Sequence, residues 1–316
     1  MNCIPVFKKV KLASQKLIML EADTINKILV MVADAAVANT GFILTENKKD
    51  RDIMDVSDPN YDRLLLTSGR IDGIATDIRS VASLTDPLGR EILKKKMQNG
   101  LLISKIPVPF GVIGVIYEAR PNVTFDVFSL CFKSGNACIL KGGSDAIHSN
   151  KAIVEIIKSV LKNNGIDQNI VALLPPGRDE TVQLLNAGKY VDLIIPRGSR
   201  SLIDYVRKNA SVPVIETGAG ICHTYFDESG DKEKGRKIIF NAKTRRVSVC
   251  NALDCLIVHK SRLDDLDYLV GLCSDSKVVI FADDLAFRAL KGKYPSELLQ
   301  NAKKDRAGPR DGSISR

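Results

Sequence analysis

A repeated alternation of short apolar segments with helical segments, between residues 110 and 218, constrains the fold more than any other feature of the sequence. The apolar segments are rich in Val, Ile and Leu, which is typical of buried strands, and the longer segments between them carry apolar residues at helical spacing. The predicted strands span 110–119, 136–143, 170–176, 191–199 and 212–218, and the predicted helices span 119–135, 144–165, 179–188 and 200–210. Strands that alternate with helices predict a parallel, doubly wound α/β sheet.

The residues before this alternation favour helices. Apolar residues at 28–38 recur at helical spacing, and we expect residues 1–100 to be helical until Pro87 and Gly89 break the pattern. Residues 101–109 differ, because Pro107 and Pro109 exclude a helix, and this segment is predicted to be an extended strand.

A second α/β unit begins at Glu216. Its predicted strands, 221–227 and 254–260, flank a predicted helix at 231–244. Residues 303–316 are polar and contain Gly and Pro, which is typical of a disordered tail. We therefore divide the chain into a first domain at 1–215, a second at 216–302 and a tail at 303–316.

The composition predicts a protein without membrane spans, disulfides or metal. A chain of 316 residues, 45% of them hydrophobic, has enough apolar residues for two domains. No stretch approaches the roughly 18 uninterrupted apolar residues of a membrane span. No cysteine pair shows a CxxC spacing and the three histidines are scattered, so we expect free thiols and a cytoplasmic location. The seven cysteines are Cys3, Cys131, Cys138, Cys222, Cys250, Cys255 and Cys273.

The net charge of +9 allows two kinds of partner. A basic surface can bind nucleic acid, or it can attract an anionic substrate and cofactor. Residues 301–316 hold five Lys or Arg against two Asp, which places +3 of the excess in one tail. With no Trp and only 5% aromatic residues, the sequence offers no basic and aromatic platform. Nucleic-acid binding is therefore the weaker interpretation.

Three of the predicted strands end in polar or glycine-rich turns, where open parallel sheets bind their ligands. The turns are 141–144 (KGGS), 197–199 (RGS) and 216–218 (ETG). A Gly-Ser turn before a helix presents backbone N–H groups to an anion, although ordinary turns share this sequence. Two such turns and a lysine predict a nucleotide site. The conventional Rossmann mode is not predicted, because no GxGxxG fingerprint is present.

Two further residues are candidates for chemistry. Cys250 follows Arg245 and Arg246, and a nearby cation lowers the pKa of a thiol, although a structural cysteine is the alternative. Asn122 lies in a turn after Pro121, where its amide could donate to a developing oxyanion. Asn is also common in turns that have no catalytic role.

Three segments resemble the gamma-glutamyl phosphate reductases of the aldehyde dehydrogenase superfamily. They are 108–150, 212–227 and 241–252, and they include RPNVT, LKGGSDAIHSN and NAKT…CNA. The resemblance extends to about residue 302 and is more specific than a general aldehyde dehydrogenase pattern. It implies NADPH-dependent reduction of L-glutamyl 5-phosphate to L-glutamate 5-semialdehyde with release of phosphate, the second step of proline synthesis from glutamate.

The resemblance also implies roles for single residues. Cys250 matches the nucleophile that forms a thioester, and Asn122 matches the amide that stabilises the oxyanion. The residues matched to cofactor binding are Lys141, Gly142, Ser144, Gly198, Ser199 and Glu216. Relatives that prefer NAD often place a carboxylate at the position of Ser144, so a serine there predicts a preference for NADPH. Arg120 and Arg246 are candidates for the substrate carboxylate.

The resemblance gives the domains their expected functions. Residues 1–215 would be an NADP-binding domain with a possible oligomerisation strand at 99–109, and 216–302 a partial catalytic domain. The family's Gly- and Phe-rich C-terminal segments have no counterpart in the sequence, so we expect a homo-oligomer only in full-length relatives and poor turnover here. The alternatives are an impaired product that only binds nucleotide, and a general NAD(P)-linked aldehyde dehydrogenase.

Overall fold

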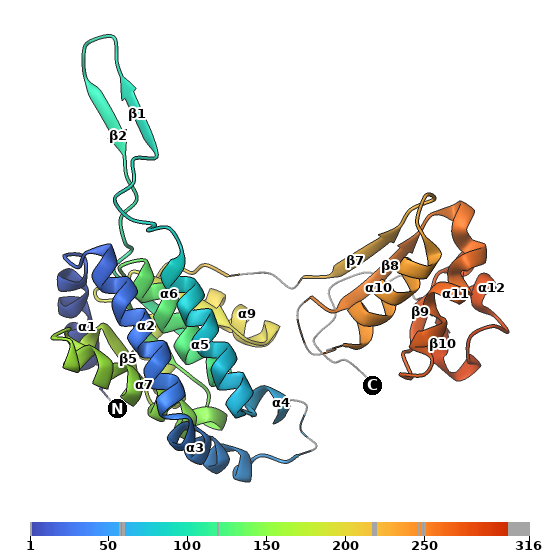
Figure 1. Ribbon diagram of the computed structural model, residues 1–316, viewed down its shortest axis with the longest axis horizontal. Coiled ribbons are helices and arrows are strands. Elements are labelled where there is room, and N and C mark those ends of the chain that lie inside the picture. The colour runs from blue at the N-terminus through green and yellow to red at the C-terminus, as the bar shows by residue number, and fades with distance from the viewer. Residues whose placement is uncertain are drawn as a thin grey trace. The chain divides into compact units, whose positions relative to one another are not determined.

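A computed structural model describes residues 2–56, 58, 61–118, 120–216, 220–245, 247, 249 and 251–302. The chain divides into two compact units, Met1–Glu216 and Thr217–Arg316, and each is described by itself (Figure 1). The predicted nucleophile Cys250, the candidate Arg246 and the tail at 303–316 lie outside the described residues.

Helices form the N-terminal part of the first unit, as the sequence predicted. They are α1 (Ile4–Leu17), α2 (Ala22–Ala38), α3 (Thr40–Ile53), α4 (Tyr61–Leu64) and α5 (Ser68–Ser83). The apolar face of α2 is buried, and Thr67 caps α5 by accepting a hydrogen bond from the Arg70 backbone N–H. Within the described residues no single helix could cross a membrane, and only the bent pair of α2 and α3 passes by combined length and composition.

Asp192 joins the N-terminal helix to the start of the sheet. Its two carboxylate oxygens accept hydrogen bonds from Lys11 Nζ at 2.8 and 2.7 Å, and Oδ2 also accepts from the Val112 backbone N–H at 2.8 Å. Gly111 has a φ of +117°, and a Cβ there would lie 2.5 Å from Asp192 Oδ2, so this position requires glycine. Helix α1 is thus tied to a residue 181 positions later in the chain.

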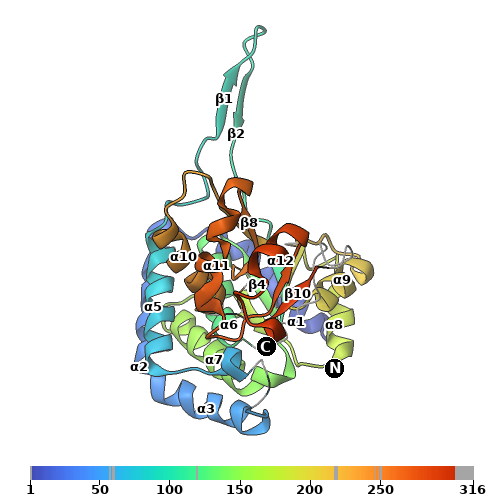
Figure 2. The same ribbon diagram turned by 90° about the vertical axis from the view of Figure 1, so that its right-hand side faces the viewer.

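The helices end at Ser83, before the predicted break at Pro87 and Gly89, and the sequence did not predict the strand that follows. Strand β1 (Leu93–Lys96) pairs antiparallel with β2 (Leu102–Lys105), and Gly100, with a φ of +85°, lies in the turn between them. All residues of both strands are exposed, and in both views the hairpin projects away from the rest of its unit (Figures 1 and 2). A strand exposed on both faces has no alternating burial to reveal it in the sequence. The proposed oligomerisation role of 99–109 stays a prediction.

The predicted parallel sheet is confirmed. Its strand order is β5-β4-β3-β6, and every pairing is parallel. The strands are β3 (Val112–Tyr117), β4 (Ala137–Lys141), β5 (Val171–Leu173) and β6 (Leu193–Arg197). The helices that follow them are α6 (Asn122–Lys133), α7 (Ile147–Asn163), α8 (Arg178–Leu185) and α9 (Arg200–Asn209), and a short 3₁₀ turn, η1 (Ser144–Ala146), precedes α7. The chain leaves β3 toward β4 on one side and returns to β6 on the other, which makes the β3–β6 boundary the topological switch point.

The fifth strand, predicted at 212–218, is not a full strand. Only Val214 forms an isolated parallel bridge, to Ile194 of β6. Pro213 has no N–H to donate, and its carbonyl accepts from the Ile194 N–H at 2.8 Å. The pairing is therefore short, and Thr217 and Gly218 lie outside the described residues.

The second unit has its own core and two pairs of parallel strands. Strands β7 (Cys222–Phe226) and β8 (Leu253–Val258) pair around α10 (Lys232–Thr244), as predicted. The sequence did not predict the second pair, β9 (Ile280–Ala282) and β10 (Leu299–Asn301), or the helices α11 (Leu266–Val270) and α12 (Asp284–Leu290). Phe226, Leu269 and Leu290 are among the buried residues of this core.

Candidate active site

The carboxyl ends of β4, β3 and β6 meet at one edge of the sheet. Ile116 pairs with Lys141, and the next residue of β3, Tyr117, pairs with Arg197. The residues that follow these strands therefore lie at the same edge. They include Asn122, Gly142, Ser144, Gly198 and Ser199 from the predicted site.

Lys141 is a buried lysine whose ammonium makes few hydrogen bonds within the described residues. Lys141 ends β4 with 5% of the residue exposed, and its only hydrogen bond to a described residue is a long one, at 3.3 Å, to the Gly142 carbonyl. Burial lowers the pKa of Lys141, while the negative charge of Glu180 acts to raise it. A buried ammonium has three donors, so this arrangement favours an external acceptor. Ser144 lies nearby in sequence and is exposed, and its hydroxyl donates to Asp145 at 3.3 Å and to no other residue that the structure describes.

The turn after β6 is different, because its donors are already engaged. The Ser199 backbone N–H donates to Glu118 Oε2 at 2.8 Å, and the Ser199 hydroxyl donates to Glu118 Oε1 at 2.9 Å. A Cβ on Gly198 would lie 2.6 Å from the same carboxylate. The Ser199 N–H and hydroxyl, in the turn that the sequence assigned to a pyrophosphate, thus hold an internal anion, which a phosphate would have to displace.

Asn122 begins α6 and is oriented by a carboxylate one turn later. Its Nδ2 donates to Asp126 Oδ2 at 3.1 Å. Burial, followed by the charge of Asp77, raises the pKa of Asp126 to about 6, and the Asn122 amide and Arg197 act in the opposite direction. The second N–H of the Asn122 amide has no partner among the described residues, so it is available as an oxyanion donor.

Glu216 is the last residue of the first unit. Its Oε1 lies 3.5 Å from Arg207 Nη1, and its Oε2 is buried without a hydrogen bond to any described residue. The cofactor role of Glu216 stays a prediction. Arg120, the other described candidate for the substrate carboxylate, lies between β3 and α6.

Sequence reasoning missed Glu118, Asp126 and Asn150. Glu118 directly follows a buried strand, so a polar residue at a strand end was its only signal. Asp126 lies at helical i, i+4 spacing from Asn122, which would have placed the two on one face. Asn150 has no local signal, because its neighbours belong to another helix and to the turn after β4.

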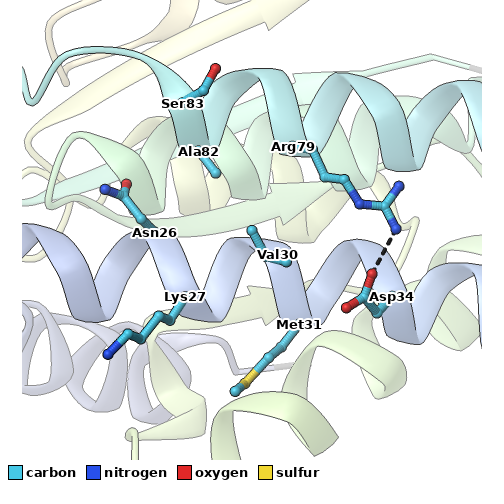
Figure 3. Close-up of a pocket in the computed structure, with 8 residues that line it drawn as sticks. All are labelled: Asn26, Lys27, Val30, Met31, Asp34, Arg79, Ala82 and Ser83. Carbon is cyan, nitrogen blue, oxygen red and sulfur yellow. Dashed lines mark hydrogen bonds and ion pairs between the residues drawn. The ribbon is translucent and has the colours of Figure 1, made fainter.

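Two surface hollows lie outside these turns. One, of about 520 Å³, lies between α2 and α5, where Arg79 and Asp34 form an ion pair at 2.6 Å (Figure 3). Its lining residues are Asn26, Lys27, Val30, Met31, Asp34, Arg79, Ala82 and Ser83. The other, of about 610 Å³, runs along α7 and β5 and includes Lys158. Neither is lined by any of the predicted site residues.

Comparison with known proteins shows the protein family to which the chain belongs. A family model described as the aldehyde dehydrogenase family matches residues 23–271, and the chain belongs to that family. Within it, the chain is 61% identical over 301 residues to a gamma-glutamyl phosphate reductase of Bacteroides thetaiotaomicron, covering 95% of this chain and 72% of that protein. It is 56% identical over 308 residues to the enzyme of the same name from Parabacteroides distasonis, covering 98% and 74%.

A solved structure agrees with these relatives. The crystal structure of gamma-glutamyl phosphate reductase from Thermotoga maritima superposes with a TM-score of 0.86 at 35% identity, covering 96% of this chain and 73% of that one. The chain therefore belongs to the gamma-glutamyl phosphate reductase family, which confirms the resemblance found in the sequence.

Proposed function

We propose that the chain reduces L-glutamyl 5-phosphate to L-glutamate 5-semialdehyde with NADPH and releases phosphate, as the second step of proline synthesis. The observation that carries the proposal is the 61% identity to a gamma-glutamyl phosphate reductase across 95% of this chain. The edge of the sheet that joins Asn122 to Lys141 supports it, because it combines an amide donor with a buried cation.

The proposed chemistry is acyl transfer to a cysteine followed by reduction. The Cys250 thiolate attacks the acyl carbon, the carbon–oxygen bond to phosphate breaks, and phosphate leaves with the electron pair. Asn122, oriented by Asp126, donates to the acyl oxygen as negative charge develops there. Loss of one such donor typically costs about 2.7–4 kcal/mol of transition-state stabilisation. When bound, NADPH would supply the hydride that reduces the thioester.

The cofactor-binding residues would be those at the two turns. Lys141 offers a buried ammonium short of acceptors, Ser144 offers a hydroxyl in place of a repelling carboxylate, and both suit a 2′-phosphorylated ribose. Gly198 and Ser199 fit a pyrophosphate once Glu118 moves off their donors. Calorimetric titration should therefore show tighter binding of NADPH than of NADH.

The reverse reaction provides the test, because it avoids the labile acyl phosphate. The chain is mixed with L-glutamate 5-semialdehyde, inorganic phosphate and NADP, and NADPH is followed by its absorbance. We expect NADPH formation that requires phosphate, because phosphate must attack the thioester in this direction. Cys250→Ser should abolish it, and the matched control Cys255→Ser should not, because Cys255 is a half-buried thiol on β8.

The other outcomes identify the alternatives. NADPH formation that does not depend on phosphate would indicate a general aldehyde dehydrogenase that uses water. Binding of NADPH without any turnover would favour the product that only binds nucleotide. Full activity of Cys250→Ser would contradict the assignment of the nucleophile.

A further inference from the structure

A buried chain of polar side chains links three elements beneath the candidate site. Tyr117 ends β3, Thr124 lies in the first turn of α6, and Asn150 lies in the first turn of α7. The Tyr117 hydroxyl lies 2.7 Å from Thr124 Oγ1, which lies 2.8 Å from Asn150 Oδ1. The three residues are 2%, 0% and 1% exposed, so water does not replace these bonds.

The hydrogen bonds run in one direction. The single hydroxyl proton of Thr124 is donated to Asn150 Oδ1, so Thr124 must accept from Tyr117. Burial raises the pKa of Tyr117, which keeps its phenol protonated as the donor. The hydroxyl protons of Tyr117 and Thr124 are thus both donated. The hydrogen bond that Oδ1 accepts from Thr124 fixes the orientation of the Asn150 amide.

The Nδ2 end of the Asn150 amide packs against the turn after β4. Asn150 Nδ2 makes no hydrogen bond among the described residues and faces Gly142. A Cβ on Gly142 would lie 2.4 Å from Nδ2 and 3.4 Å from the Tyr117 hydroxyl oxygen. Gly142 therefore packs against both ends of the polar chain, and its position is set by them.

This packing connects the two halves of the candidate site. Gly142 directly follows Lys141, and Thr124 lies two residues after Asn122 on α6. A shift of the Asn150 amide would move the turn that carries the ammonium and would free the helix that carries the oxyanion donor.

We propose that Asn150 is a positioning residue for the cofactor, which holds the Lys141–Ser144 turn in its binding conformation through Gly142 and through the Thr124–Tyr117 hydrogen bonds. The proposal rests on the proposed function, because it assumes that this turn binds the dinucleotide. Asn150 itself need not touch the cofactor.

The first test measures NADPH binding by calorimetry. Asn150→Ala and the isosteric Thr124→Val both break the polar chain, and each should raise the Kd for NADPH by about tenfold or more. Tyr117→Phe removes only the far donor and should have a smaller effect. Thr124→Val provides the same test if Asn150→Ala folds poorly.

A matched control separates positioning from general destabilisation. Asn47 is also 1% exposed, and its amide donates to the Leu64 carbonyl at 2.9 Å and the Ser149 hydroxyl at 3.0 Å. Asn47→Ala should lower the melting temperature, as Asn150→Ala does, but leave the Kd for NADPH unchanged. Hydrogen exchange of the backbone amides at 142–144, measured without cofactor, should accelerate in Asn150→Ala only.

A second test uses the contact between Asn150 and Gly142 itself. Gly142→Ala places a methyl group on Nδ2 and should weaken NADPH binding, and Asn150→Ala removes the clashing amide. The double variant should therefore bind NADPH better than the sum of the two single effects implies.

The outcomes distinguish this inference from the proposed function. Unchanged Kd and unchanged amide exchange in Asn150→Ala would overturn the positioning role while leaving the function intact. Equal weakening by Asn47→Ala would overturn it as well. Failure of the unaltered chain to bind NADPH would overturn both.

Discussion

The turns after β4 and β6 look alike in sequence but differ in how their donors are used. Both end a parallel strand at the same edge of the sheet, and both contain Gly followed within two residues by Ser. The first leaves the Lys141 ammonium buried with one long hydrogen bond. The second has its Ser199 donors filled by Glu118, which is 81 residues away in sequence. A glycine-rich turn thus predicts where an anion can bind, but not whether the protein already supplies one.

Of the changes that test this difference between the turns, removal of the Lys141 ammonium should have the largest effect on NADPH binding. Lys141→Met should weaken NADPH binding by about 10- to 100-fold, because a charge-assisted hydrogen bond is worth about 1.5–3 kcal/mol. Calorimetry with NADPH measures it. Lys158→Met is the control, because burial also lowers the pKa of Lys158, but it lies along α7 away from the turn. An equal loss in both variants would show that general positive charge, and not the turn, attracts the cofactor.

The Asp126 carboxylate on α6 should produce a pH dependence of stability. The pKa of Asp126 is raised from 3.8 to about 6, so its favourable contribution is complete below its unfolded pKa and is lost as the pH rises through about 6. The groups that face it are Asp77 on α5, Arg197 at the end of β6 and Asn122 on its own helix. Asp126→Asn should stabilise the protein at neutral pH by about 1–2 kcal/mol.

Urea unfolding at a series of pH values measures this change. The unaltered chain should lose more stability than Asp126→Asn between roughly pH 4 and 6. Asp72→Asn on α5 is the control, since Asp72 is exposed and lies on the same helix as Asp77. Parallel pH profiles for the unaltered chain and Asp126→Asn would contradict the prediction.

The smallest expected effect concerns the filled turn. Glu118→Gln removes the internal anion while keeping one acceptor, so the Ser199 donors become easier to displace toward a phosphate. NADPH should bind about fivefold tighter, which corresponds to about 1 kcal/mol for one hydrogen-bonded pair. The exposed Glu155→Gln on α7 serves as the control. Weaker binding would mean that Glu118 shapes the turn for the cofactor and does not compete with it.

The parts of the fold that the sequence predicted are those with a strong burial pattern. Residues 112–117 and 137–141 are completely buried strands, and their apolar runs bounded by turns identified them. The prolines that follow it identified the exposed strand at 102–105, but its partner at 93–96 was missed because an exposed strand shows no burial pattern. The strand at 212–218 was overestimated because Pro213 interrupts its pairing, which an apolar pattern does not register.

The residues of the candidate site also differ in whether the local sequence indicates them. Lys141, Gly142 and Asn122 could be proposed from the sequence because each stands at a strand or helix end within a recognisable segment, and their roles remain predictions. Glu118 and Asn150 were not, since their roles depend on partners 81 and 26 residues away that only the folded chain brings together. The assignment of Cys250 remains a prediction from the family resemblance.

The pairing of Lys11 with Asp192 has a consequence for how the protein is made. A ribosome adding roughly 5–20 residues per second releases α1 on the order of ten to forty seconds before Asp192 has been synthesised. During that interval the face of α1 that is buried in the folded chain, with Phe7, Val10 and Leu17, lacks its contacts with the residues that are synthesised later. The first unit therefore cannot complete its native contacts strictly from the N-terminus onward. The apolar face of the nascent helix stays exposed during this interval, and a chaperone that binds apolar helices would have access to it.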